Sequence, residues 1–318
     1  MAKYSIGIDI GGTKTAYGLF NEARDMIARH QHPSDSSLGN EEFFTVIAEN
    51  VKQLCADNSI PLSDLAGVGV GMPSFIRFDE GRILKTVNLT NLKNFAARDF
   101  LQNLLGVPVV LDNDTHVAAL AEYKLGAGRG LKHMMYTAVS TGIASGIIIN
   151  GELFRGSYGW AGETGHMLLS PGEGELCGCG HRGCFMSYTS GSMIVKHIQT
   201  RIRKGDKTLM TELAGSNEHI NAHHLLEACR RNDPMALWAL DQMADKLAVW
   251  LYNLYETLNI NVYVFGGGLV NFGPLLFDRI RARFDELNLE GYPVEFRFAE
   301  LKNDFGIIGA SLLVDSAN

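Results

Sequence analysis

A strand, a glycine turn and a returning strand occur near the N-terminus of this 318-residue chain and again near its middle. The first turn is Gly11-Gly12-Thr13, and the second is Ser140-Thr141-Gly142. The apolar runs around them predict strands at Tyr4–Ile10, Thr13–Phe20, Met134–Val139 and Gly146–Ile149. The repeat predicts a duplicated unit. Two α/β lobes with a cleft between them are its expected consequence.

The rest of the chain alternates between helical and strand periodicity, which favours α/β layers with a mixed sheet. Helices are expected at Glu41–Asn58, Phe95–Leu105, Thr115–Leu125, from Asp233-Pro234 onward, at Pro274–Leu287 and at Gly306–Val314. Further strands are expected at Leu65–Val70, Val107–Leu111 and Asn261–Phe265. Residues 156–192 are rich in glycine and carry little periodicity, so they are predicted to be loop.

Composition limits the classes of function. The formal net charge of −7 argues against a nucleic-acid partner, which needs a basic surface. No segment large enough for a DNA-binding domain precedes residue 4, so no attached DNA reader is expected. No run of about 18 apolar residues predicts a membrane span, and we expect a cytoplasmic protein. The odd, clustered cysteines do not resemble a secreted disulfide framework, and the isolated Cys55 and Cys229 are expected to be buried.

The glycine turns are candidates for binding phosphate. GIDIGGTK nearly matches a P-loop, but the order is Gly12-Thr13-Lys14 and the turn leads into a strand. Backbone N–H groups of a hairpin can still bind phosphate, and Asp9 at the strand end could face Mg²⁺. A plain hairpin is the alternative. Gly266-Gly267-Gly268 also follows an apolar strand, and the three turns together favour a nucleotide.

A candidate catalytic base lies in LDNDTH, between a predicted strand and a predicted helix. Asp114 could be the N-cap of that helix, which is the commonest role for Asp at such a position. Alternatively it is a general base that accepts a proton from a sugar hydroxyl. Asn113 beside it can both donate and accept hydrogen bonds, which suits a polyol.

Three clustered cysteines, Cys177, Cys179 and Cys184, stand in GELCGCGHRGC. GCGHRG matches the dinucleotide pattern G-x-G-x-x-G, but no strand precedes it and no helical pattern follows directly. A redox C-x-x-C is absent because Cys177 and Cys179 are one residue apart. Three thiolates and one further ligand predict a closed, structural zinc site, with His181 or His166 as the fourth ligand.

Taken together, these motifs resemble the ROK family of sugar kinases and sugar-responsive repressors, within the actin-like ATPase superfamily. The resemblance covers nearly the whole chain. It is carried by residues 9–14, residues 113–114, VSTGIASGIIINGELFRGSYGWAGETGHM at 139–167, the cysteine loop and residues 266–268. It implies a two-lobed actin-like (ribonuclease H-like) α/β fold with a cleft. The implied lobes are residues 1–114 plus 303–318, and residues 115–302 with the zinc loop.

The resemblance also implies an ATP- and Mg²⁺-dependent kinase that phosphorylates a sugar hydroxyl, by analogy the 6-hydroxyl of a hexose or hexose derivative, with Asp114 as base. The implied ATP-binding residues are Asp9, Gly11, Gly12, Thr13, Lys14, Thr141, Gly142, Gly266, Gly267 and Gly268. The implied sugar-binding residues are Gly71, Asn88, Asn113, Asp114, Glu163 and His166. His166, rather than His181, is the implied fourth zinc ligand. Family members are commonly homodimers or dimers of dimers.

Two positions depart from the family pattern. Family kinases usually read Cys-Leu-Glu after the last zinc cysteine, and that Glu binds the sugar near its anomeric end. Here Met186 takes its place, and each hydroxyl left unpaired would cost roughly 1–3 kcal/mol. Ser74 stands where glycine is more usual and could crowd the sugar. Ordinary glucokinase activity is therefore doubtful. A sugar-binding regulator or sensor is the alternative. A third class, an actin-like ATPase that assembles into polymers, is disfavoured by the zinc loop.

Overall fold

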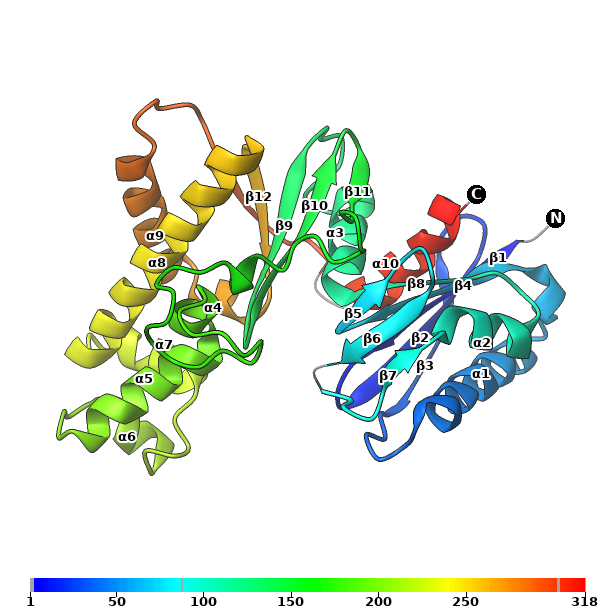
Figure 1. Cartoon of the computed structure of the whole chain (residues 1–318), viewed down its shortest axis with the longest axis horizontal. Helices are drawn as coiled ribbons and strands as arrows, with labels where there is room; N and C mark the ends of the chain where they lie inside the picture. Colours follow the sequence, from blue (N-terminus) through cyan, green and yellow to red (C-terminus); the bar gives the residue numbers. More distant parts are fainter. Residues whose placement is uncertain (1–2, 87, 302–303, 318) are drawn as a thin grey trace. The chain divides into compact units, whose positions relative to one another are not determined.

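The computed structural model describes residues 3–86, 88–301 and 304–317 (Figure 1). Contacts along the chain divide it into two compact units. Unit 1 comprises Met1–Tyr136, Gly146–Gly162 and Ala299–Asn318, and unit 2 comprises Thr137–Ser145 and Glu163–Phe298. The lobe boundary expected between residues 302 and 303 lies outside the described residues, and the two lobes stay a prediction.

The main sheet of unit 1 has the strand order β3-β2-β1-β4-β8. Its strands are β1 (Tyr4–Ile10), β2 (Lys14–Phe20), β3 (Met26–Pro33), β4 (Leu65–Met72) and β8 (Val109–Asn113). Strands β1, β2 and β3 pair antiparallel, whereas β4 runs parallel to both β1 and β8. A smaller sheet contains β5 (Ser74–Arg77), β6 (Arg82–Thr86) and β7 (Lys93–Phe95). The parallel pairing brings the carboxyl ends of β1, β4 and β8 to one edge of the sheet.

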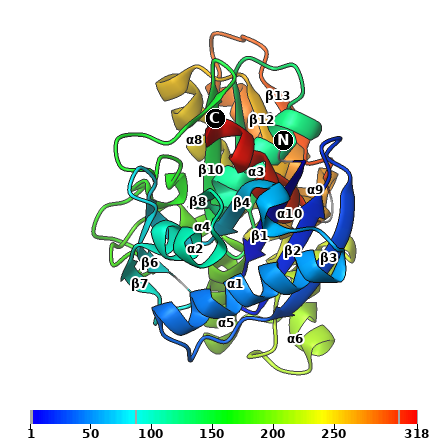
Figure 2. The same cartoon turned by 90° about the vertical axis from the view of Figure 1, so that its right-hand side faces the viewer.

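Helices cover both faces of this sheet (Figures 1 and 2). They are α1 (Asn40–Asp57), α2 (Ala97–Leu105), α3 (Asp114–Leu125) and α10 (Phe305–Leu313), with short turns η1 (Leu62–Asp64) and η4 (Val314–Ala317). The isoleucines of β1 alternate with small or polar residues and form one core with α1 and α2. Helices α3 and α10 lie on the opposite face, where they share a second core with Val110 of β8.

Glycines allow α10 to lie directly on the sheet. A Cβ atom added to Gly7 of β1 would lie 1.9 Å from the carbonyl oxygen of Ile307. One added to Gly69 of β4 would lie 1.7 Å from that of Ala310. These positions alternate with the large apolar residues of the same strands, so one face is filled by side chains and the other by helix backbone.

Unit 2 combines strand segments with a group of helices. The strands β9 (Met134–Val139) and β10 (Ile143–Ile149) are divided between the units, whereas β12 (Val262–Gly266) and β13 (Glu295–Phe298) belong to unit 2. The helices are η2 (Thr164–His166), α4 (Met186–Thr189), α5 (Gly191–Arg203), α6 (Leu209–Ala214), α7 (Ala222–Arg230), α8 (Pro234–Leu258), η3 (Gly268–Phe272) and α9 (Pro274–Leu287). Buried Trp250 of α8 donates its indole N–H to the Thr164 carbonyl at 3.1 Å, which anchors η2.

The second large sheet has the order β11-β10-β9-β12-β13, where β11 is Glu152–Phe154. Numbered along the chain, the strands of both large sheets follow the order third, second, first, fourth, fifth. In each case the first two strands flank a glycine turn. The duplicated plan predicted from the sequence is confirmed.

Most predicted elements agree with the structure within a few residues, and three differences stand out. Residues 156–192 contain η2, α4 and the start of α5, so the prediction of loop throughout was wrong there. These helical pieces are too short to show a period. Strand β10 begins earlier than expected, at Ile143. Edge strand β3 is largely exposed and therefore lacks the apolar alternation that marks a strand.

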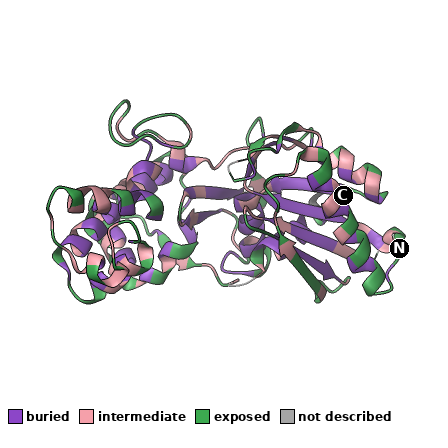
Figure 3. Cartoon of the chain, turned by 90° about the horizontal axis from the view of Figure 1, so that it is seen from below, coloured by how far each residue is buried: buried purple, intermediate pink, exposed green. Residues whose placement is uncertain are grey.

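Figure 3 shows that the strands of the unit 1 sheet are mainly buried, apart from edge strand β3, while the helices also carry exposed residues. Cys55 and Cys229 are both buried, as predicted. Within the described ranges, no helix has both the length and the apolar character needed to cross a membrane.

Candidate functional site

The predicted phosphate turn of unit 1 is held from two directions. Within the turn, the Gly11 N–H donates to the Lys14 carbonyl at 2.9 Å. Ser34, just beyond β3, donates its hydroxyl to the Gly11 carbonyl at 2.8 Å and its N–H to the Thr13 carbonyl at 3.0 Å. Sequence reasoning missed Ser34, because only the pairing of β2 with β3 brings it to the turn.

The same turn lies against a predicted sugar-binding residue. A Cβ atom added to Gly12 would lie 2.6 Å from Cβ of Asn88, so this glycine is required for the close approach. Asn88 is exposed. The structure therefore brings part of the predicted ATP set and part of the predicted sugar set together within unit 1.

Asp9 lies at the carboxyl end of β1, opposite Gly71 of β4 in the parallel register. Burial, together with the carboxylates of Asp114 and Asp304, raises the pKa of Asp9 from 3.8 to about 6, while Lys14 opposes the shift. A Cβ atom added to Gly306, in the first turn of α10, would lie 2.5 Å from the Asp9 carboxyl group. Mg²⁺ prefers oxygen ligands such as carboxylates, so Asp9 fits Mg²⁺.

Gly71 has a packing role that the sequence did not indicate. A Cβ atom at this position would lie 3.0 Å from Cγ2 of Val117 in α3, and Gly71 itself is buried. The absence of a side chain allows α3 to approach β4. Contact of Gly71 with a sugar stays a prediction.

Asp114 is the first residue of α3, and Asn113 before it is the N-cap. The Asn113 side chain accepts the Thr115 N–H at 2.8 Å, and Asp114 accepts the same N–H at 2.9 Å. Burial raises the pKa of Asp114, although the hydrogen bonds from Thr115 and the charge of His116 act in the opposite direction. Because Asn113 caps the helix, Asp114 is not required for that role.

A buried charged network lies directly beside this pair. Fully buried Asp112, the residue before Asn113, accepts from Nδ1 of His116 at 2.8 Å and from Nε of Arg155 at 2.7 Å. Nε2 of His116 lies 2.7 Å from the carbonyl oxygen of Ala161. Sequence reasoning missed this network. The Asp-x-x-x-His spacing across a strand–helix junction was its only local signal, and Arg155 has none.

In unit 2, the turn at residues 140–142 is held like its counterpart in unit 1. Its Ser140 N–H donates to the Gly142 carbonyl at 2.9 Å, and the Ser192 hydroxyl donates to the Thr141 carbonyl at 2.7 Å. Gly267 has a φ of +87°, and a Cβ atom there would lie 2.6 Å from the carbonyl oxygen of Val139. Gly266 ends β12, and Gly267 and Gly268 are exposed beyond it. The two predicted ATP-binding segments of unit 2 therefore meet.

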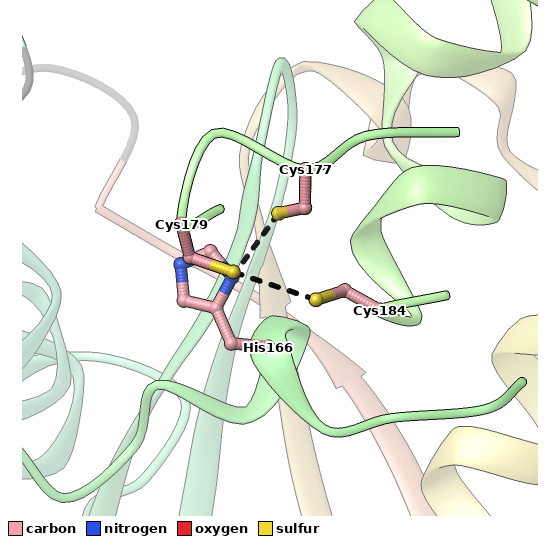
Figure 4. Close-up of side chains that lie close together, drawn as sticks. All are labelled: His166, Cys177, Cys179 and Cys184. Atoms are coloured by element: carbon pink, nitrogen blue, oxygen red, sulfur yellow. Dashed lines mark hydrogen bonds between the residues drawn. The ribbon is translucent and has the colours of Figure 1, made fainter. Parts of the chain in front are cut away.

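The four residues His166, Cys177, Cys179 and Cys184 form the His/Cys cluster (Figure 4), whose ligand atoms all lie within 4.8 Å of one another. Nδ1 of His166 lies 3.4 Å from Sγ of Cys177, and Sγ of Cys179 lies 3.5 Å from Sγ of Cys184. Tetrahedral zinc with bonds of about 2.0–2.3 Å requires ligand separations of roughly 3.5–3.8 Å. The cluster therefore fits zinc, with His166 rather than His181 as its histidine.

His166 also faces a predicted sugar-binding residue. Its Nε2 lies 3.7 Å from Oε2 of Glu163, while Nδ1 is directed to the thiols. Met186 begins α4 immediately after the cluster, and a Cβ atom added to Gly142 would lie 3.4 Å from its sulfur atom. Met186 therefore reaches the phosphate turn of unit 2.

Ser74, the other position that departs from the family pattern, lies in unit 1. It is buried, with its hydroxyl 3.3 Å from the Met72 carbonyl.

The two large sheets share one strand order, each with a glycine turn after its first strand, and this architecture is that of the actin-like ATPase fold. The ROK family model matches residues 5–317, and the chain belongs to this family.

Similar proteins include enzymes and regulators. A glucokinase of Halalkalibacterium halodurans is 31% identical over 98% of this chain and 95% of its own length. The crystal structure of a ROK family glucokinase from Streptomyces griseus, in complex with glucose and AMPPNP, is 29% identical with a TM-score of 0.80, covering 98% of this chain and 99% of that one. The xylose repressor of Bacillus subtilis is 27% identical over 98% of this chain and 74% of its own length.

Proposed function

We propose that this ATP-dependent carbohydrate kinase transfers the terminal phosphate of ATP to a sugar hydroxyl, with Asp114 as general base. The observation that carries the proposal is the position of Asp114 at the start of α3, where Asn113 already caps the helix. Burial raises the pKa of Asp114, which makes its carboxylate a stronger base than an exposed one. It would accept the hydroxyl proton as the sugar oxygen bonds to phosphorus and ADP leaves.

We assign the ATP phosphates to the turns at residues 11–14 and 140–142, and the adenosine to residues 266–268. The serine hydrogen bonds to turn carbonyls support this assignment, because they fix both backbones before a ligand binds. Asp9 would hold Mg²⁺, directly or through water, and the bound ion would neutralise charge on the phosphates.

For the sugar, we assign Gly71, Asn88, Asn113, Glu163 and His166 together with Asp114. We propose a hexose or hexose derivative as the substrate, a class that the glucokinase relatives support, with the 6-hydroxyl as the phosphorylated position. Zinc in the His/Cys cluster would fix the ring of His166 and so orient Nε2 toward Glu163 and the sugar. Met186 offers a thioether where family kinases usually carry Glu, and a thioether accepts almost no hydrogen bond, which argues against a free, polar anomeric end bound as in those kinases.

The test is an ATP-consumption screen with D-glucose, D-mannose, D-fructose, N-acetyl-D-glucosamine and N-acetyl-D-mannosamine. We expect one of these sugars to be phosphorylated by the wild-type chain. With that sugar, Asp114→Asn should lower kcat by about 10²–10⁴-fold while ATP binding and the circular dichroism spectrum are retained. Wild-type turnover by the Asn variant would refute the role of Asp114.

A sugar-binding regulator or sensor is the second candidate. It is favoured by Met186 and by the likeness to the xylose repressor, and disfavoured by the retained base and phosphate turns. Thermal stabilisation by one sugar of the panel, without ATP consumption on any, would support it. We further propose that the protein is cytoplasmic and that it forms a homodimer or a dimer of dimers. Sedimentation can test the oligomeric state.

A further inference from the structure

The buried network beside Asp114 restricts the protonation state of His116. Its Nδ1 lies 2.8 Å from a carboxylate oxygen of Asp112, and its Nε2 lies 2.7 Å from the carbonyl oxygen of Ala161. Both of these atoms can only accept hydrogen bonds while Asp112 is ionised. A neutral imidazole has one N–H, so it would direct the lone pair of its other nitrogen at one of these oxygens. Only the imidazolium ion satisfies both contacts.

The charge balance of the network agrees with an imidazolium. Burial opposes the positive charge, but Asp112 and the Ala161 carbonyl outweigh it, so the pKa of His116 is raised above its usual 6.5. Burial likewise opposes ionisation of Asp112, and its two cationic partners lower the pKa of Asp112 instead. Arg155 itself packs over the ring of Phe78 at 3.8 Å, which holds its guanidinium group against Asp112.

The network continues into the residues assigned to the sugar. The carboxylate oxygen of Asp112 that accepts from His116 also accepts the backbone N–H of Asn113 at 2.8 Å. Asn113 in turn caps α3 and donates its amide to the Ser74 carbonyl at 3.2 Å. The hydrogen bonds of His116 therefore hold the first turn of α3 at one side, and those of Asn113 hold it at the other. Asp114 stands between the two.

We propose that His116 is a positioning residue, held permanently as an imidazolium by Asp112 and the Ala161 carbonyl, which fixes the direction of Asp114. This inference rests on the proposed role of Asp114 as base. The imidazolium has a second consequence, because its positive charge acts against the rise that burial causes in the pKa of Asp114 and so favours the ionised base. His116 makes no contact with the sugar in this role.

Other groups that face Asp114 within unit 1 are Asp9 of β1 and Tyr136 of β9. Burial raises the pKa of Tyr136, so the phenol stays neutral at physiological pH. Asp9 carries the same sign of charge as Asp114 and would raise its pKa. His116 is therefore the positive group in the first turn of α3, and it offsets these neighbours.

The central test compares His116→Gln with His30→Gln, a matched control on the exposed strand β3 whose Nε2 bonds to the Asn50 side chain at 2.9 Å. With the sugar that turns over in the panel, His116→Gln should lower kcat by about 10–100-fold, because a small misplacement of a base costs rate steeply. KM for ATP should change less than about 3-fold. The acidic limb of kcat/KM against pH should move to higher pH, whereas His30→Gln should match the wild type.

A second measurement does not depend on activity or on the stability of a variant. Nitrogen-15 NMR of histidine-labelled wild-type protein should show one histidine with both ring nitrogens protonated at pH 8.5. The absence of any such histidine would overturn the imidazolium. A folded His116→Gln variant with wild-type kcat and an unmoved acidic limb would overturn the positioning role.

The outcomes separate the two proposals. If no sugar of the panel is phosphorylated by the wild-type chain, the proposed function fails, and the NMR measurement still decides the state of His116. If the wild type is active and Asp114→Asn is not, while His116→Gln behaves as wild type, the base stands and the positioning role is refuted.

Discussion

Replacing Asp9 with Asn should stabilise the folded protein at neutral pH while it removes activity. Asp9 is half-buried at the end of β1, and the Asp114 carboxylate lies close enough to add to the effect of burial on its pKa. An ionised Asp9 is therefore unfavourable in the folded protein without bound Mg²⁺. Asn has nearly the same shape and cannot ionise, so it avoids this cost.

The magnitude follows from the pKa of Asp9, which is about 6 in the folded chain against an ordinary 3.8. Between these values the folded state keeps a proton that the unfolded state has lost, so stability falls as pH rises through this window. The cost of ionising Asp9 is about 1 kcal/mol at pH 4.5 and about 3 kcal/mol at pH 8. The difference in unfolding free energy between Asp9→Asn and wild type should grow by about 2 kcal/mol across this range.

Urea unfolding followed by circular dichroism at pH 4.5, 6 and 8 measures this difference. Asp245→Asn, on an exposed part of α8, is the control and should show no trend with pH. Added Mg²⁺ at pH 8 should stabilise the wild type more than Asp9→Asn, because the ion offsets the carboxylate charge. A variant that is equally or less stable than wild type at pH 8, with no trend, would refute the reasoning.

Two further predictions concern the scaffold. Gly69→Ala would place a Cβ atom 1.7 Å from the Ala310 carbonyl oxygen and should lower the unfolding free energy by about 3 kcal/mol or more. Gly39→Ala, whose nearest neighbour would lie at 3.9 Å, should cost at most about 1 kcal/mol, and equal losses in the two variants would contradict the packing argument. Elemental analysis of protein purified without added metal should find about one zinc per chain. Chelation should lower Tm in a way that zinc, and not Mg²⁺, restores. Metal-free protein with an unchanged Tm would rule out a structural zinc.

The catalytic candidates were partly readable from local sequence and partly not. Asp114 and Asn113 could be placed at a strand–helix junction, because a strand end and a helix start are both local patterns. The sequence could not decide whether Asp114 caps α3 or is free to act as a base, since that depends on side-chain direction. The structure assigns the cap to Asn113. The contact between His116 and the Ala161 carbonyl could not be predicted from the sequence either, because the segment around residue 161 comes close to α3 only in the folded chain.

The sequence by itself determined the elements that depend on neighbours along the chain. Apolar runs ending in glycine turns gave the duplicated strand plan, and Asp233-Pro234 marked the start of α8. The cysteine spacing indicated a metal site, but it did not decide whether His166 or His181 is the fourth ligand. Only the tertiary structure decided which histidine lies close to all three thiols, why β1 and β4 carry glycine on one face, and which charges surround Asp114. These properties arise from contacts between residues far apart in the chain, and a local pattern carries no record of such contacts.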